Sequence, residues 1–403
     1  MPNKKNKHKR KDKVNIKIDD DLDSILEQFT LEQKSNKKNM VLMGEWKTEP
    51  ADIQKCHNVH NPVYSYSNTL NPISVFDQTI PERVKSMRKA AEVHRQARKY
   101  IQSIIQPEMG YLDVCTRLEN KVVELYGKND LTEGIGFPTG FSVNHVAAHD
   151  SANPGDTRTI KQDDVIKIDF GTHCDGYIID SAFTVAFNPI YEPLLKATKE
   201  ATWEGIKMAG PDVLVNDISK VIKETIESYE IEINGKIHPI KAVTNLGGHN
   251  IKQYVIHGGK LILGGPTDSP LVENMRMESG ECFAIETFAT TGVTNNVIND
   301  TSSVVNHYML KPDKPKPIFT LPSTDKLYGY IQKNRSTLPF CTRWLERDLG
   351  KTYRSGLMEL EKKDLLSSYP PLVDIKGTYT SQWEHTIYLH DYGKEVLSAG
   401  DDY

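Results

Sequence analysis

The chain has 403 residues, of which 38 % are hydrophobic and 26 % are charged, and its formal net charge is −4. This length allows one large unit with extensions, and the composition allows a sizeable core. The small net charge excludes a global attraction to nucleic acid or membranes. No apolar run reaches the roughly 18–20 residues that span a bilayer.

The cysteines are few, scattered and never spaced as CxxC. Their odd number argues against a disulfide framework, and their spacing argues against a cysteine zinc site. The N-terminus is basic but lacks the apolar segment of a signal peptide. We therefore expect a reducing, cytoplasmic setting for the protein with its five cysteines, Cys56, Cys115, Cys174, Cys282 and Cys341.

The first eighty residues are predicted to be a basic and polar extension that is partly disordered. Residues 1–13 are dominated by Lys and Arg and carry no large apolar residue after Met1. Such a tail is either a solubilising or nuclear-type address, or an electrostatic contact for ribosomal RNA. Residues 32–80 are rich in Pro and Asn, which indicates a weakly structured connector.

Ordered structure is expected from residue 81 onward. Val84, Met87, Ala91 and His94 begin a series of apolar or buried-type positions at steps of three or four, which predicts an amphipathic helix. The stretch "YLDVCTRLENKVVELYG" predicts a second helix. Two more helices are expected around "YEPLLKATKEATWEGIKMA" and "VNDISKVIKETIESY".

Strand-like runs dominate the centre of the chain up to Val305, among them "KAVTNL" and "CFAIETFAT". Residues 306–370 change character, because "TDKLYGYIQKN", "PFCTRWLERDL" and "LMELEKKDLLSSY" have helical patterns. The stretch "TYTSQWEHTIYLH" then returns to strand. The sequence predicts an α+β fold with one catalytic domain over residues 81–403 and a helical insert at about 306–370.

One hairpin carries two acidic residues in otherwise apolar strands. In "VIKIDFGTHCDGYIIDSAFTVAF", a loop at Cys174–Asp175 pairs Asp169 with Asp180, whereas a loop at Asp175–Gly176 makes Asp180 a diagonal neighbour. Both registers put the two carboxylates on one face of the sheet. Either one aspartate faces solvent, or the two share a proton, or a cation compensates them.

Three further candidate ligands lie in similar surroundings: Glu286 in "FAIETF", Glu384 in "SQWEHTIYL", and His249 after two glycines in "NLGGHNI". Each is weak evidence alone. Together, four carboxylates and one imidazole carry a charge of about −4, which matches two divalent cations bridged by carboxylates. Hard oxygen ligands with one nitrogen suit Co, Mn, Zn or Fe.

The ordered set Asp169, Asp180, His249, Glu286 and Glu384 resembles the dinuclear metal site of methionine aminopeptidases, which have the pita-bread (creatinase/aminopeptidase) fold. Flanking motifs are similar to the type 2 class: "FPTGFSVNHVAAHDSANPGD", "NLGGHNIKQYVIHGGK", "FAIETFATTG" and the closing "GDDY". The long connection between Glu286 and Glu384 and the basic extension are also typical of that class. The resemblance covers residues 80–403.

The resemblance implies a role for each candidate. Asp169 would chelate one metal ion, Asp180 and Glu384 would bridge both, and His249 and Glu286 would complete the second. A water held between the ions would attack the scissile carbonyl, with Glu286 carrying its proton.

Further residues are assigned by the same resemblance. His149 and His257 would bind the substrate amide and stabilise the tetrahedral intermediate. His149 matches the position that fumagillin-type epoxides alkylate. The residues that match the lining of the methionine pocket are Phe137, Ile256, His307 and Tyr369; each could instead be plain packing.

The family resemblance therefore implies cotranslational removal of the initiator methionine before a small second residue, by a monomer with two divalent ions. Two other functions are considered: a non-catalytic relative that binds ribosomes or RNA, and a proline-specific aminopeptidase. The former would lack metal ligands, all of which are present here. The latter would need a larger N-terminal domain than residues 1–80 provide.

Overall fold

The computed structural model describes residues 63–65, 81–391 and 393–402. The predicted basic tail at residues 1–13 and most of the predicted connector lie outside the described residues. Within that connector, β1 (Val63–Ser65) pairs antiparallel with β18 (Gly393–Val396). A strand at a sheet edge has unpaired backbone groups that a short segment can satisfy. The connector thus contributes one strand to the folded unit.

The first half of the fold packs two helices on an antiparallel sheet. The sheet runs in the order β2 (Glu133–Val143), β4 (Val165–Cys174), β5 (Tyr177–Ala186). The helices are α2 (Glu82–Ile104) and α3 (Tyr111–Tyr126), as the periodicity predicted. Their apolar faces bury against the sheet through Ala97, Ile101, Val114, Leu118, Phe141, Ile168 and Phe170.

The second half repeats the layer of helices on a larger sheet, which comprises seven strands among the described residues. Its path is β1-β18-β17-β11-β9-β10, and β8 also pairs with β11. The added bounds are β8 (Lys241–Ala242), β9 (Gly247–Ile251), β10 (Leu261–Leu263), β11 (Cys282–Thr290) and β17 (Thr380–Leu389).

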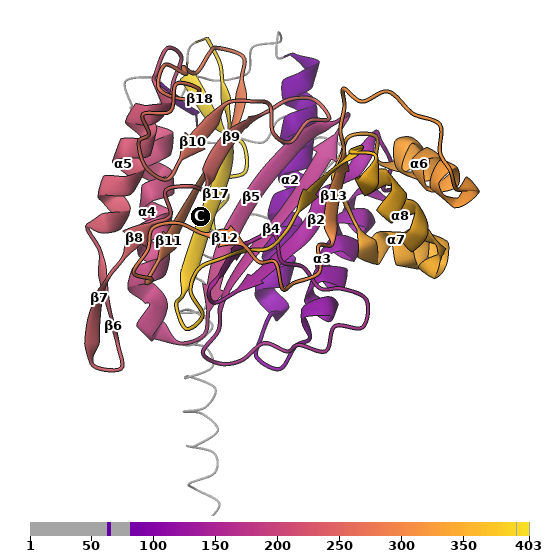
Figure 1. Cartoon of the computed structure of the whole chain (residues 1–403). Helices are drawn as coiled ribbons and strands as arrows, with labels where there is room; N and C mark the ends of the chain where they lie inside the picture. The colour runs from indigo at the N-terminus through magenta and orange to yellow at the C-terminus, as the bar shows by residue number, and fades with distance from the viewer. Residues whose placement is uncertain (1–62, 66–80, 392, 403) are drawn as a thin grey trace, which may run out of the picture.

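Two predicted helices cover this second sheet: α4 (Glu192–Met208), which follows the short turn η2 (Pro189–Tyr191), and α5 (Val215–Glu227). Figure 1 shows both helix pairs behind the layer of strands, with α4 and α5 on the left and α2 and α3 toward the right. The predicted strand "KAVTNL" is shorter than expected. β8 ends at Ala242, and one more backbone bond joins it to β11, from Val243 N to Phe288 O at 2.9 Å. Thr244 then bonds the backbone of Asn295 instead.

The two halves meet where β5 lies beside β17, although the strands belong to different sheets. Hydroxyl side chains join them. Ser181 Oγ donates to Glu384 O at 2.8 Å, and Thr386 Oγ1 donates to Asp180 O at 2.6 Å while accepting from Asp180 N at 2.8 Å. These bonds hold the backbones of two candidate metal ligands at a fixed spacing.

Each of the three stretches predicted to be helical within the insert contains a helix, and the flanks of the insert are strands. Its helices are α6 (Pro322–Asn334), α7 (Thr342–Leu349) and α8 (Tyr353–Lys362), with a short turn η3 (Gly350–Thr352). Its flanks form a small sheet in the order β14 (Phe340–Cys341), β13 (His307–Leu310), β15 (Leu366–Tyr369).

The helix predicted over "LMELEKKDLLSSY" ends at Lys362, because Asp364 adopts a left-handed backbone with φ 56°. The following Leu366–Tyr369 then pairs with His307–Leu310. Figure 1 shows the insert on the right flank of the molecule. The remaining strands are β3 (Val146–Ala148), β6 (Glu230–Ile233), β7 (Lys236–Pro239), β12 (Ile298–Asn299) and β16 (Leu372–Val373).

None of the helices in the described ranges is long and apolar enough to cross a membrane.

Candidate metal centre and substrate pocket

The hairpin that carries both aspartates has the second of the two predicted registers. Its loop is Asp175–Gly176, and Asp169 pairs with Ala182 while Gly171 pairs with Asp180. Both loop residues have left-handed backbones, φ 53° and 76°, as a type I′ turn requires. No bulge interrupts this ladder between Val165 and Ala186. Asp169 and Asp180 are therefore diagonal neighbours on one face.

The other three candidates come from the second sheet. Glu286 on β11 lies directly opposite Glu384 on β17, and His249 on β9 lies opposite Ala284. The period of two therefore puts all three on one face. A Cβ on Gly248 would lie 2.3 Å from Ala284 O, so this glycine lets β9 approach β11 closely.

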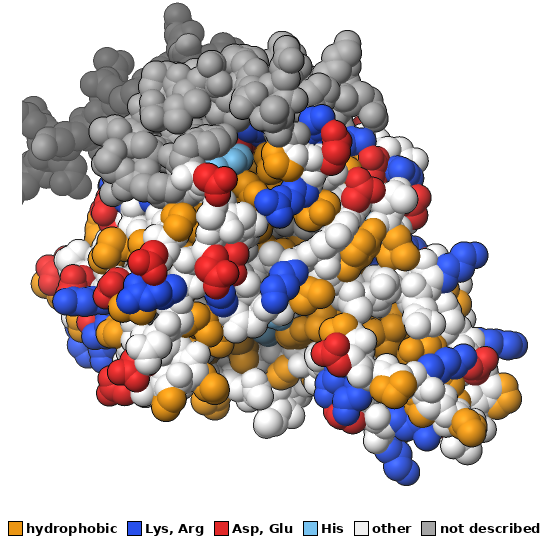
Figure 2. Space-filling view, turned by 90° about the horizontal axis from the view of Figure 1, so that it is seen from above, with side chains coloured by type: hydrophobic (Ala, Val, Ile, Leu, Met, Phe, Trp, Pro, Cys, Tyr) orange, Lys and Arg blue, Asp and Glu red, His pale blue; other side chains and the backbone are white. Residues whose placement is uncertain are grey.

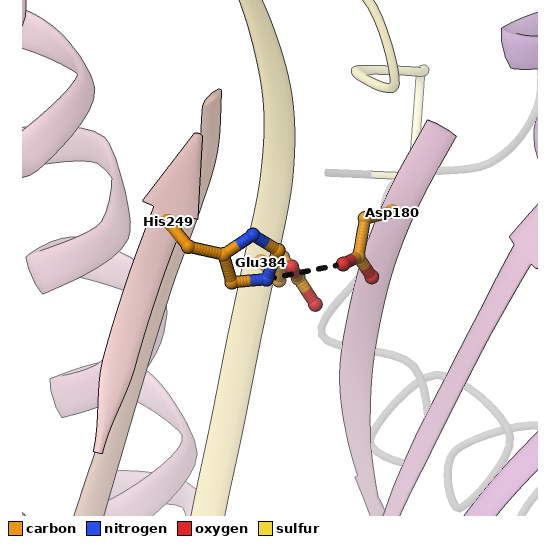
Figure 3. Close-up of side chains that lie close together, drawn as sticks. All are labelled: Asp180, His249 and Glu384. Atoms are coloured by element: carbon orange, nitrogen blue, oxygen red, sulfur yellow. Dashed lines mark ion pairs between the residues drawn. The ribbon is translucent and has the colours of Figure 1, made fainter. Parts of the chain in front are cut away.

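Asp180, His249 and Glu384 each offer one ligand atom, and these atoms lie within 4.8 Å of one another. Figure 3 shows Asp180 and His249 pointing toward each other from either side of the strand that carries Glu384. His249 Nε2 lies 3.5 Å from Asp180 Oδ2 and 3.7 Å from Glu286 Oε1. These separations are too long for good hydrogen bonds and leave the imidazole nitrogen directed at the carboxylates.

A glutamine that the sequence analysis missed links the remaining aspartate to this cluster. Gln382 Nε2 donates to Asp169 Oδ2 at 3.1 Å and to Glu286 Oε2 at 3.4 Å. Gln382 lies two residues before Glu384 on β17, so strand parity alone would have placed it on the same face. The five predicted ligands thus converge on one site, which we call the metal floor: Asp169, Asp180, His249, Glu286 and Glu384.

The electrostatics of the metal floor suit a cation. Burial raises the pKa of Asp180 to about 7, and burial plus mutual repulsion holds the pKa values of Asp169, Glu286 and Glu384 well above their usual range. The buried Asp169 Oδ1 and Asp180 Oδ1 accept no hydrogen bond within the described part of the chain. No lysine or arginine is among the described residues that line the cavity. The residues present therefore fit a divalent metal.

The protonation state of the His249 imidazole fits that of a metal ligand. Burial lowers its pKa to about 4, so the ring is neutral at physiological pH. Its Nδ1 lies 3.4 Å from Asn250 O, which can only accept a hydrogen bond. The proton therefore belongs on Nδ1, and the lone pair of Nε2 faces the carboxylates.

A cavity of about 340 Å³ opens above the metal floor. All four residues predicted to line a methionine pocket are among its walls, together with Pro339, which the sequence analysis did not single out. We call this set the pocket wall: Phe137, Ile256, His307, Pro339 and Tyr369. A Cβ on Gly171 would lie 2.3 Å from the Phe137 ring, so the ring rests directly on the aspartate hairpin.

Both predicted substrate histidines also border the cavity. His149 has a left-handed backbone, φ 67°, which is uncommon for a residue with a side chain and typical of functional sites. Its Nδ1 lies 3.3 Å from Pro370 O, and burial lowers its pKa to about 4. The neutral ring therefore donates through Nδ1 and leaves the lone pair of Nε2 free of that bond.

His257 stands between the metal floor and the pocket wall. Its ring is 4.4 Å from the His249 ring in an edge-to-face arrangement and 5.7 Å from the Tyr369 ring. The side chain remains accessible to solvent. His257 thus lies at the edge of the cavity between the imidazole of His249 and the aromatic ring of Tyr369. Figure 2 shows the molecule from above, where acidic and basic side chains are interspersed on the surface that is not grey.

Comparisons with known proteins agree with this arrangement. The sequence profile of metallopeptidase family M24 matches residues 85–307. Methionine aminopeptidase 2 of Schizosaccharomyces pombe is 47 % identical over 325 residues, which cover 80 % of this chain and 74 % of the relative. Methionine aminopeptidase 2A of Arabidopsis thaliana is 44 % identical over 362 residues, which cover 89 % of this chain and 75 % of the relative.

Solved structures show the same fold at low sequence identity. A thermophilic Arx1 superposes with a TM-score of 0.67 at 17 % identity, covering 79 % of this chain and 91 % of that one. A methionine aminopeptidase from Thermotoga maritima superposes with a TM-score of 0.52 at 19 % identity, covering 79 % and 98 %. The predicted α+β pita-bread fold is confirmed. The chain belongs to metallopeptidase family M24, within the type 2 methionine aminopeptidases.

Proposed function

We propose that this chain is a metallo-aminopeptidase that removes the N-terminal methionine of nascent chains whose second residue is small. The observation that carries the proposal is the convergence of five ligand side chains, two histidines and an apolar wall on one cavity. Family membership and relatives named methionine aminopeptidase 2 support it.

The proposed centre holds two divalent ions, which are Co, Mn, Zn or Fe. Asp169 would hold one ion, Asp180 and Glu384 would bridge both, and His249 and Glu286 would complete the second. The diagonal placement of the aspartates and the direct Glu286–Glu384 pair supply carboxylates from both halves of the fold. When bound, the ions would lower the pKa of water between them and polarise the scissile carbonyl.

The protein groups around the centre would handle the proton and the substrate. Glu286 would carry the proton from the water to the leaving amine; its carboxylate lines the cavity, and burial raises its pKa well above the usual range. His257 would bind the substrate amide and stabilise its developing oxyanion. His149, whose Nε2 carries a lone pair, would accept a hydrogen bond from the N–H of the substrate amide. The free Nε2 lone pair of neutral His149 also makes this ring the expected target of a fumagillin-type epoxide.

The cavity would recognise the free N-terminus of the peptide as well as the side chain of its first residue. Methionine would lie along the pocket wall, and a free α-amino group would reach the metal floor. A crowded subsite beyond the scissile bond would admit only a small second residue. The proposed catalytic domain spans residues 81–403, preceded by an extension over residues 1–80.

The extension is proposed to act separately from the chemistry. Residues 1–13 carry a run of Lys and Arg, and such runs bind RNA phosphates in a salt-dependent way. We propose that this tail contacts the ribosome in the cytoplasm. Deleting residues 2–13 should weaken co-sedimentation with ribosomes at low salt and leave peptide turnover unchanged. Unchanged co-sedimentation would leave only a solubilising role.

The proposed activity is tested with three peptides and a metal titration. Purified protein reloaded with Mn or Co should release methionine from Met-Ala-Ser, leave Met-Lys-Ser intact, and leave an N-acetylated Met-Ala-Ser intact. Absence of methionine release from Met-Ala-Ser with all four metals would reject the function. Methionine release from Met-Lys-Ser as fast as from Met-Ala-Ser would reject only the requirement for a small second residue.

A further inference from the structure

The strand that carries Phe137 is irregular on both sides of that residue. Along β2 the pairing with β4 shifts between Ile135 and Phe137, and shifts again between Phe137 and Gly140. Each shift inserts one extra residue into β2, which is a β-bulge. The two bulges present the Phe137 ring to the cavity and remove backbone groups from the ladder.

The insert supplies the partners for the first bulge. The guanidinium Nη2 of Arg335, just after α6, donates to Ile135 O at 2.9 Å, to Gly136 O at 3.1 Å and to Pro339 O at 2.9 Å. Arg335 is buried, at 6 % exposure, and lies 4.9 Å from the centre of the Trp344 ring. One nitrogen therefore ties the backbone before Phe137 to the backbone of Pro339, a second residue of the pocket wall.

The second bulge is held in the same way. His307 Nε2 contacts Pro138 O at 3.3 Å, and Glu119 Oε1 accepts from Thr139 N at 3.2 Å. Glu119 is itself fixed by the insert, through an ion pair with Arg343 and a 2.8 Å hydrogen bond from Trp344 Nε1. Buried carbonyl and amide groups that lose a ladder partner are costly unless another group satisfies them.

We propose that Arg335 is a positioning residue through which the insert sets the side-chain selectivity of the pocket. It does not line the cavity, and it acts through the backbone that aims Phe137 and through Pro339. Charge suits this position because one buried guanidinium satisfies three neutral acceptors at once. The Glu119–Arg343 pair completes the same support at the second bulge. The inference rests on the proposed aminopeptidase function.

The test compares three variants of the full-length, metal-loaded protein: Arg335→Met, Arg335→Lys and the control Arg354→Met. Arg354 is an exposed arginine of the same insert that pairs with Glu346. In Arg335→Met, the ratio of kcat/KM for Met-Ala-Ser to that for Leu-Ala-Ser should fall about tenfold, mainly through KM for the Met peptide. Metal content per chain should stay at the wild-type value, and Arg335→Lys should show a smaller fall.

A ratio within twofold of wild type in folded Arg335→Met would overturn the proposal. So would an equal loss of kcat for both peptides accompanied by loss of metal, because that pattern indicates a purely structural role. If Arg335→Met does not fold, Arg335→Lys decides: a lowered ratio supports the proposal and an unchanged ratio rejects it. Arg354→Met should match wild type throughout.

A second measurement tests the positioning role of Arg335 independently of the proposed aminopeptidase activity. If the wild-type protein releases no methionine, that function fails, whereas hydrogen–deuterium exchange over residues 133–143 still reports on Arg335. Exchange in this segment should be faster in Arg335→Met than in wild type or Arg354→Met. Equal exchange in all three proteins would overturn the positioning role.

Discussion

The metal floor and the pocket wall share one cavity but are built in different ways. The floor comes from regular ladders: an uninterrupted hairpin for the two aspartates and a direct cross-strand pair for the two glutamates. The wall comes from a doubly bulged strand, from loops and from the insert, with Pro339 and Tyr369 some two hundred residues beyond Phe137.

This difference separates the chemistry from the selectivity. Regular strand pairing fixes the spacing of charged groups to within a narrow range, which the proposed pair of metal ions would need. Bulges aim individual side chains away from the regular pattern, which suits a pocket shaped to one substrate. Changes in the floor should therefore alter metal content and kcat, and changes in the wall should alter KM and selectivity.

The largest effect is expected in the floor itself. Asp180→Asn keeps the shape of the side chain but removes the charge of a proposed bridging ligand. Metal content should fall, and kcat for Met-Ala-Ser should fall by about a thousandfold or more, since bound metal supplies several kcal/mol of stabilisation. Metal analysis and steady-state kinetics check this. Asp163→Asn, on an exposed loop, is the control; full turnover in Asp180→Asn would remove Asp180 from the site.

The next largest effect is expected at His257, which lies between the metal floor and the pocket wall. His257→Ala should retain wild-type metal content but lose about a hundredfold to a thousandfold in kcat, the usual cost of removing one oxyanion donor. His238→Ala, on the distant β7, is the matched control. Loss of metal together with activity would instead assign His257 to the metal floor.

A third prediction concerns the pH dependence of stability that His307, a residue of the pocket wall, contributes. Burial lowers the pKa of His307 from 6.5 to about 4 in the folded protein. The unfolded chain therefore binds more protons between these pH values, and the contribution of His307 to stability, full above pH 6.5, is lost as the pH falls toward 4. This loss amounts to about 2 kcal/mol between pH 6.5 and pH 5.

Urea unfolding at pH 6.5 and pH 5 measures this contribution. The free energy of unfolding should fall less between the two pH values in His307→Asn than in wild type, by about the same 2 kcal/mol. Other buried histidines leave a background slope in both proteins, so the difference between the slopes is the readout. Identical slopes would show that His307 titrates normally in the folded protein.

The smallest effect is expected from a substitution that changes the shape of the pocket wall. Phe137→Leu should lower kcat/KM for Met-Ala-Ser about tenfold, mainly through KM, because an apolar pocket discriminates by small volumes. Metal content should not change. Phe319→Leu, in the insert but outside the cavity lining, is the control. A loss of metal in Phe137→Leu would show that floor and wall are not separable.

Much of the fold could be predicted from local patterns. Helical periodicity predicted α2, α3, α4 and α5, and alternation with an Asp-Gly loop predicted the aspartate hairpin. The same alternation, applied to β17, would also have identified Gln382. The insert was predicted less well, because "LLSSY" has helical composition and becomes a strand only by pairing with β13.

The sequence by itself determined which residue types could hold two divalent ions and which faces of their strands they occupy, because side-chain direction along a strand follows from parity alone. It left the hairpin register open between two loops, and only the folded hairpin decided it. The tertiary structure alone decided that β5 lies beside β17 through serine and threonine hydroxyls, and that Arg335 supports a bulge two hundred residues away. Such contacts join segments with no shared local pattern, so only the packed fold brings them together.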